Sequence, residues 1–298
     1  MAARSAAGNL IVSVRPDQWT KNLIVFAALI FARQLLDPAA LALASAAFLI
    51  FCALSGAVYL VNDVTDREAD RLHPQKSGRP IASGALSPGA ALGWATGLGA
   101  GALAAAFALR PAFGIAAAAY LALFAWYTHT LKHIVILDVM AIAVGFVLRA
   151  VAGGLIIGVP ISDWLLVCTI LLALFLGLAK RRHEITLLTD GAPGHRPILE
   201  EYDPYLLDQM IAVVAAATLV AYIIYCTSPD THARFSTDWL VLTTPFPIYG
   251  IFRYLYLVHR KRGGGSPSEM LLQDRPLLGC VALWGLAVVV IIYRPFGS

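Results

Sequence analysis

The sequence has little charge and no long polar segment. Of its 298 residues, 59% are hydrophobic and only 13% are charged, whereas soluble domains carry about 25% charged residues. The longest polar stretches, 62–87, 180–205 and 259–276, are each too short to fold as a separate domain. These features exclude an ordinary soluble enzyme and predict a single transmembrane domain over residues 1–298.

Cysteine pairs and a signal peptide are also missing. The four cysteines lie in or beside apolar segments without paired spacing, so we expect reduced, buried thiols at Cys52, Cys168, Cys226 and Cys280. Residues 1–21 contain no long apolar run, so no cleavable signal peptide is expected.

Apolar segments long enough to enter a membrane make up most of the chain. A bilayer core of roughly 30 Å needs about 20 apolar residues per helix. Leu, Ala, Val and Ile dominate these segments without strand-like alternation, which favours helices over a barrel. The prediction is an all-α integral membrane protein with about nine transmembrane helices, at residues 22–36, 39–61, 88–109, 111–130, 134–157, 164–179, 206–227, 239–258 and 277–293.

The basic residues predict the orientation. With nine spans and a cytoplasmic N-terminus, the inner segments hold 16 of the 22 Lys and Arg residues. Cytoplasmic loops of membrane proteins carry this excess of positive charge. We therefore expect the N-terminus inside, the C-terminus outside and the polar loops at the cytoplasmic face of a plasma membrane.

Carboxylates gather where the second span ends. Tyr59, Asp63, Asp66 and Asp70 recur at helical spacing, with Asn62 beside them, and would form one stripe if the helix continued. Stacked carboxylates repel one another unless a cation lies between them. Oxygen ligands without Cys or His suit Mg²⁺, which commonly binds one or two carboxylates together with substrate phosphates.

Cations follow this acidic stripe and can bind phosphate oxygens that the metal leaves uncovered. Lys76 and Arg79 come next in the sequence. The alternative interpretation is a solvated loop, since Asp and Arg between membrane helices are usually exposed surface. A second polar cluster on the same predicted side favours the functional interpretation.

That second cluster follows the sixth span. Its basic residues could serve only as a topology anchor, but acids and tyrosines follow them. The candidate substrate-binding residues here are Lys180, Arg181, Arg182, Glu184, Tyr202 and Asp208.

Further charges lie near or within the predicted spans. Asp138 opens the fifth span, and Arg149 lies three turns later on the same face. A charge at that depth costs about 2.5–3.5 kcal/mol on insertion scales, so Arg149 should face a cavity or a partner. Arg149 is a candidate substrate-binding residue, and a structural ion pair is the alternative. Arg15 and Lys21 precede the first span and could hold a lipid phosphate or simply anchor the interface.

These motifs resemble a known family over nearly the whole chain. The run N-D-x-x-D-x-x-x-D from Asn62 to Asp70 is similar to the first aspartate-rich motif of the UbiA-type membrane prenyltransferase superfamily. The segments at 15–22, 73–84, 145–154 and 180–184 resemble its decaprenyl-phosphate phosphoribosyltransferase branch. The resemblance implies a helical bundle around a central cavity, and transfer of ribose 5-phosphate from phosphoribosyl diphosphate to a polyprenyl phosphate.

One departure from the superfamily pattern bears on the donor. Aromatic prenyltransferases place a second acidic pair after the sixth helix, whereas this chain has Lys180-Arg181-Arg182-His183-Glu184. Positive charge at residues 180–182 favours a donor that carries an additional phosphate group. We expect Mg²⁺ on Asp63 and Asp66, supported by Asn62 and Asp70, with the donor phosphates on Lys76, Arg79 and the 180–182 cations and the acceptor phosphate on Lys21 and Arg15.

Two other functions remain open from sequence alone. One is an aromatic-ring prenyltransferase, and the other is a transporter or lipid-binding scaffold without catalysis. The expected partners are phosphoribosyl diphosphate, a polyprenyl phosphate lipid and the membrane. No nucleic-acid partner is expected, and a homo-oligomer is compatible with the sequence.

Overall fold

Helices form almost the entire chain, and no strand occurs among the residues that the structure describes. The computed structural model describes residues 5–73, 76–189, 197–261 and 267–293. Seven helices are long and apolar enough to cross a membrane: α3 (Pro38–Thr65), α5 (Pro88–Leu109), α6 (Pro111–His129), α7 (Leu137–Ile157), α8 (Asp163–Thr189), α9 (Pro204–Thr227) and α13 (Arg275–Tyr293).

Shorter helices connect or flank these seven. They are α1 (Ala6–Ser13), α2 (Ala27–Phe31), α4 (Arg67–Leu72), α10 (Pro229–Phe235), α11 (Pro245–Arg260) and α12 (Pro267–Gln273), with 3₁₀ segments η1 (Pro16–Phe26), η2 (Leu131–His133), η3 (Pro197–Glu201) and η4 (Trp239–Thr243).

Local sequence explains where several helices begin. Proline occupies the first turn of α3, α5 and α9, where its missing N–H costs nothing. The residue before each proline caps the helix with its side chain: Asp37 accepts from Ala39 N, Ser87 from Ala90 N and Asp203 from Leu206 N.

Two of the nine predicted spans differ from a continuous membrane helix. The segment predicted at 22–36 consists of the second half of η1, the short α2 and a turn containing Arg33 at φ 59°. The segment predicted at 239–258 is divided into η4 and α11, because Pro245 and Pro247 have no N–H to donate to the preceding turn. The count of nine spans stays a prediction.

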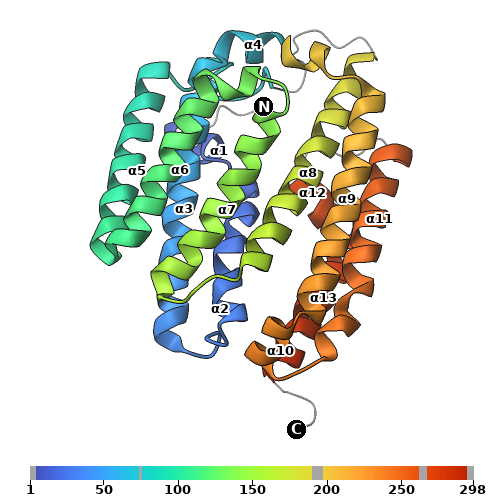
Figure 1. Cartoon of the computed structure of the whole chain (residues 1–298). Coiled ribbons are helices and arrows are strands. Elements are labelled where there is room, and N and C mark those ends of the chain that lie inside the picture. Colours follow the sequence, from blue (N-terminus) through green and yellow to red (C-terminus); the bar gives the residue numbers. More distant parts are fainter. Residues whose placement is uncertain (1–4, 74–75, 190–196, 262–266, 294–298) are drawn as a thin grey trace.

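The bundle has two apolar cores on either side of α7. One contains Phe51, Phe113 and Tyr120 from the N-terminal helices, together with Ile156 near the end of α7. The other contains Phe175 and other residues of α8, α9 and α11, together with Val139 near the start of α7. In Figure 1, α3, α5 and α6 lie on one side of α7, and α8, α9 and α11 lie on the other.

The connections that carry the polar motifs meet at one end of the bundle. Figure 1 shows α4 at the top, at the same end as the start of α9, whereas α10 lies at the opposite end. The 3₁₀ turns η2 and η3 also contact each other. The two polar segments after α3 and α8 are therefore at the same end, as the sequence predicts.

Candidate active site

The aspartate stripe bends where α3 ends. Helix α3 stops at Thr65, Asp66 caps it, and α4 begins at the next residue. Despite this break, Asp63 and Asp70 converge on one guanidinium, since Arg79 Nη1 donates to Asp63 Oδ1 at 3.1 Å and to Asp70 Oδ2 at 2.6 Å. Both carboxylates are buried.

Two further cations bind the same stripe. Arg15 donates to Asp63, and its guanidinium carbon lies 4.7 Å from the centre of the Tyr59 ring. Arg15 has φ 53° in the left-handed region, which few non-glycine residues adopt. Lys132 Nζ lies 2.6 Å from Asp66 Oδ1. Each of the three aspartates is therefore held by a cation from another segment of the chain.

Lys132 is the residue that sequence reasoning missed. It lies buried on η2, between α6 and α7. The only signal for it in the sequence is one basic residue on a very short inner loop, and the positive-inside rule already accounts for that signal.

Asn62 has the one fully buried side-chain oxygen of this motif that lacks a hydrogen-bond partner among the described residues. Its Nδ2 donates to Asp66 Oδ2 at 3.1 Å, while its Oδ1 is buried without a hydrogen-bond partner. A buried carbonyl oxygen without a donor is costly and suits a cation. Among the described residues, no group of three or more His, Cys, Asp or Glu side chains forms a ready metal site, because protein cations bind the aspartates.

The second polar cluster is an ion-paired network rather than a free basic wall. Arg181 Nε donates to Asp138 Oδ2 at 2.6 Å, and its guanidinium also donates to Glu184. Tyr202 donates to the other Asp138 oxygen at 2.7 Å and accepts from the Ile136 amide. Asp138 is fully buried. This network links the start of α7 to α8 and η3.

Arg182 is similarly engaged. Its Nε donates to Asp208 Oδ1 at 2.9 Å, and His259 Nε2 lies 3.3 Å from the same oxygen. Lys180 Nζ lies 3.9 Å from a Glu184 oxygen. These contacts connect α8 with α9 and α11, so phosphate binding by the 180–182 cations stays a prediction.

The two polar segments are close enough to affect each other electrostatically. Burial lowers the pKa of His73, the positive charge of Lys76 lowers it further, and the Glu184 carboxylate opposes this effect from α8. Glu184 on α8 is therefore within electrostatic range of His73, which follows α4.

Arg149 occupies a separate buried network. Its Nε donates to Asn22 Oδ1 at 2.7 Å and its Nη2 to the Tyr120 hydroxyl at 2.7 Å. Asn22 in turn donates to Cys52 Sγ and Ser55 Oγ on α3. The sequence pattern places Asp138 on the same face of α7 as Arg149, but the charge partner of Asp138 is Arg181. Arg149 faces polar partners, as its depth predicts.

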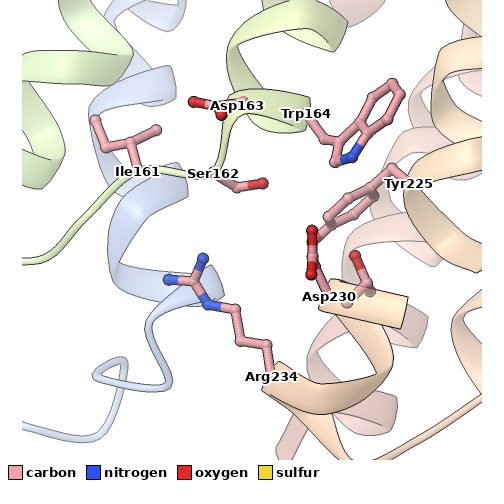
Figure 2. Close-up of a pocket in the computed structure, with 8 residues that line it drawn as sticks. Ile161, Ser162, Asp163, Trp164, Tyr225, Asp230 and Arg234 are labelled. Carbon is pink, nitrogen blue, oxygen red and sulfur yellow. The ribbon is translucent and has the colours of Figure 1, made fainter. Parts of the chain in front are cut away.

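A cavity of about 270 Å³ lies at the opposite end of the bundle. Figure 2 shows its lining residues, among them Asp230 and Arg234 of α10 and Trp164 at the start of α8. Because α10 and α4 are at opposite ends of the bundle, this cavity is not part of the aspartate site.

Comparison with known proteins assigns the family. The sequence model of the UbiA prenyltransferase family matches residues 22–273. The chain belongs to the UbiA prenyltransferase family. A UbiA homologue from Archaeoglobus fulgidus, solved bound to DMAPP and Mg²⁺, superposes with a TM-score of 0.72 at 20% identity, covering 96% of this chain and 99% of that one. At this identity the likeness establishes the UbiA fold.

Two relatives within the family share more sequence. Decaprenyl-phosphate phosphoribosyltransferase of Corynebacterium glutamicum is 33% identical, over 97% of this chain and 88% of that protein. The protein of the same name from Mycolicibacterium smegmatis is 34% identical, over 94% of this chain and 91% of that protein. The family resemblance inferred from the motifs is confirmed.

Proposed function

We propose that this UbiA-family chain transfers a 5-phosphoribosyl group from phosphoribosyl diphosphate to a polyprenyl phosphate such as decaprenyl phosphate, releasing diphosphate. The relatives named for this activity match nearly the whole chain. The observation that carries the proposal is the cation-rich aspartate site, in which Arg15, Arg79 and Lys132 surround Asp63, Asp66 and Asp70.

The aspartate motif fits a Mg²⁺ site through its oxygen chemistry. Asp63 and Asp66 supply carboxylates, Asn62 supplies a buried oxygen that lacks a donor, and Asp70 supports them through Arg79. A Mg²⁺ ion bound there supplies positive charge against the leaving diphosphate. A solved family member with Mg²⁺ bound supports this assignment.

Cations of this site can also bind the diphosphate of the donor. Arg15 and Arg79 are each partly accessible, with side chains 22% and 27% exposed. Charge-assisted hydrogen bonds to phosphate resemble those to carboxylate in strength and geometry. Arg15 and Arg79 can therefore exchange carboxylate oxygens for the diphosphate oxygens of the donor, whereas the buried Lys132 holds Asp66 in place.

The donor's 5-phosphate needs cations outside this cluster. Lys76 lies near His73 on one side, and Lys180 and Arg182 lie on α8 on the other. Arg181 is 2% exposed and bound to Asp138, so we assign it a positioning role together with Tyr202 and Glu184. Asp208 in turn orients Arg182.

The reaction needs no strong base. The bond between C1 of the ribose and the diphosphate oxygen breaks, and C1 forms a bond to an oxygen of the lipid phosphate. That oxygen is already anionic at neutral pH, so the protein's task is to hold two anions and stabilise the leaving one. Attack in line with the leaving group inverts C1.

The location follows from the same proposal. The aspartate site and its cations are at the end of the bundle that the positive-inside rule assigns to the cytoplasm. We propose a multi-pass protein of the plasma membrane, with residues 1–298 as one catalytic domain and the N-terminus and active site facing the cytoplasm, where a water-soluble sugar diphosphate is available.

A direct transfer assay tests the proposal. Purified protein with Mg²⁺ receives labelled phosphoribosyl diphosphate and decaprenyl phosphate, and the lipid phase is extracted. The expected product retains the lipid phosphate and also carries the 5-phosphate of the sugar. A parallel reaction contains a prenyl diphosphate and 4-hydroxybenzoate. Prenylated aromatic product there, with no label in the lipid of the first assay, would transfer the assignment to an aromatic prenyltransferase.

A further inference from the structure

The 3₁₀ segment η1 packs unusually close to α7. A Cβ atom on Gly153 would lie 2.2 Å from the carbonyl oxygen of Val25, so only glycine permits this approach. One turn earlier on α7, Arg149 bonds to Asn22 of η1. Lys21 precedes Asn22 directly, and its ammonium lies within electrostatic range of the Arg149 guanidinium.

Lys21 and Arg149 are both positively charged, and neither has a carboxylate partner in the described segments. Among the described residues, neither side chain forms an ion pair, although Arg149 is only 4% exposed. Other cations near the active site differ, since Arg15, Arg79, Lys132, Arg181 and Arg182 all have acidic partners. Buried charges in a membrane protein pair with other charges or with backbone carbonyls. Arg149 donates to the Gly145 carbonyl at 3.0 Å and lies over the Tyr120 ring, but no anionic group of the described residues neutralises it, which leaves a place for an anionic ligand.

Unused hydrogen-bond donors precede Lys21 directly. Trp19 Nε1 and Thr20 Oγ1 are buried, and neither has a partner within the described part of the chain. A buried donor without an acceptor is costly. Both unpartnered donors therefore lie on the same 3₁₀ segment as Lys21.

Part of the Lys21 side chain is also accessible from outside the protein. Its side chain is half-buried, yet burial and then the charge of Arg149 lower its pKa to about 8. Asp17 and Glu269 oppose this effect, and both contribute less than Arg149 and Arg15. The Lys21 ammonium is therefore partly desolvated and is not sealed inside the bundle.

We infer that Lys21 and Arg149 form the binding site for the phosphate of the lipid acceptor. The ligand class is a phosphate monoester on a long apolar chain. The inference rests on the proposed function and replaces Arg15, which is bound to Asp63, with Arg149 as the partner of Lys21.

The depth of this site suits the reaction. Asn22 contacts Ser55 on α3, eight residues before Asp63, which corresponds to about 12 Å along the helix. The acceptor phosphate would therefore lie deeper in the membrane than the donor diphosphate at Asp63. With the ribose between them, attack and departure occur on opposite sides of C1, as in-line displacement requires.

A binding measurement without donor or Mg²⁺ tests the site independently of catalysis. Detergent-purified protein is titrated with decaprenyl phosphate and with decaprenol, and binding is followed by native mass spectrometry. Wild type should prefer the phosphate form at least about tenfold, as expected for hydrogen bonds between charged groups. Lys21→Met and Arg149→Met should each reduce this preference to about threefold or less.

Arg253→Met is the matched control, because Arg253 is a partly buried cation that pairs with Asp274 instead. It should keep the wild-type preference. If Arg149→Met does not fold, Lys21→Met and Arg149→Lys decide the result, and Arg149→Lys should retain part of the preference.

Two results would overturn the inference: equal binding of phosphate and alcohol by wild type, or full preference in folded Lys21→Met. Failure of the proposed function has a different signature, namely normal phosphate preference without any transfer of labelled phosphoribose.

Discussion

Replacing Lys21 with methionine should stabilise the protein even though it impairs acceptor binding. The pKa of Lys21 is lowered from 10.5 to about 8, first by burial and then by Arg149 and Arg15, with Asp17 and Glu269 opposing. Each pKa unit corresponds to about 1.4 kcal/mol, so the charged amine costs up to about 3 kcal/mol at neutral pH. Partial accessibility of the side chain reduces this, and we expect a gain of about 1–3 kcal/mol on substitution.

The pH dependence has a definite sign. A lysine with a lowered pKa binds fewer protons in the folded state than in the unfolded state, so wild-type stability rises with pH between about 8 and 10.5. The advantage of Lys21→Met should therefore be largest below pH 8 and shrink above it.

Thermal melting in detergent without lipid substrate measures this effect. A gain of 1–3 kcal/mol corresponds to roughly 2–10 °C for a chain of this size. Arg253→Met removes a cation that has an acidic partner, so it should bring no such gain. A melting temperature of Lys21→Met at or below that of wild type at pH 7 would refute the reasoning.

Three further predictions concern other parts of the site. Asp63→Asn and Asp66→Asn should each lower turnover at least about a hundredfold, measured per folded protein with saturating Mg²⁺; near-normal rates would contradict the metal assignment. Asp138→Asn should lower the free energy of unfolding by about 3–5 kcal/mol, because Arg181 loses its buried counter-charge, whereas the more accessible Asp274→Asn should cost about 1 kcal/mol or less by the same melting assay. Gly153→Ala should weaken binding of polyprenyl phosphate and lower stability by about 1–3 kcal/mol, because its Cβ meets Val25; Gly97→Ala, with open space around it, is the control and should do neither.

Much of the candidate site could be predicted from the sequence because its signals are local. The spacing of Asp63, Asp66 and Asp70 follows one turn-by-turn pattern at a helix end, and the structure brings Asp63 and Asp70 to one guanidinium. Lys132 could not be found this way, since a single lysine on a three-residue turn has no pattern of its own.

The charge partners were the least predictable part. Arg181 and Asp138 are 43 residues apart, and Arg15 and Asp63 are 48 apart. The sequence suggested that Arg181 faces a substrate phosphate and that Arg15 and Lys21 hold the acceptor together. Packing of α8 against α7 pairs Arg181 with Asp138, and the left-handed turn at Arg15 directs its side chain to Asp63.

The sequence by itself determined the membrane class, the helical bundle and the presence of two polar segments at one end. Those properties depend on apolar length, capping residues and charge counts, which are local or additive along the chain. Only the tertiary structure decided which cation meets which carboxylate, and that Lys21 and Arg149 meet no carboxylate in the part of the chain that the structure describes. Such pairing depends on the distances between helices, and these are set by contacts such as Gly153 against Val25.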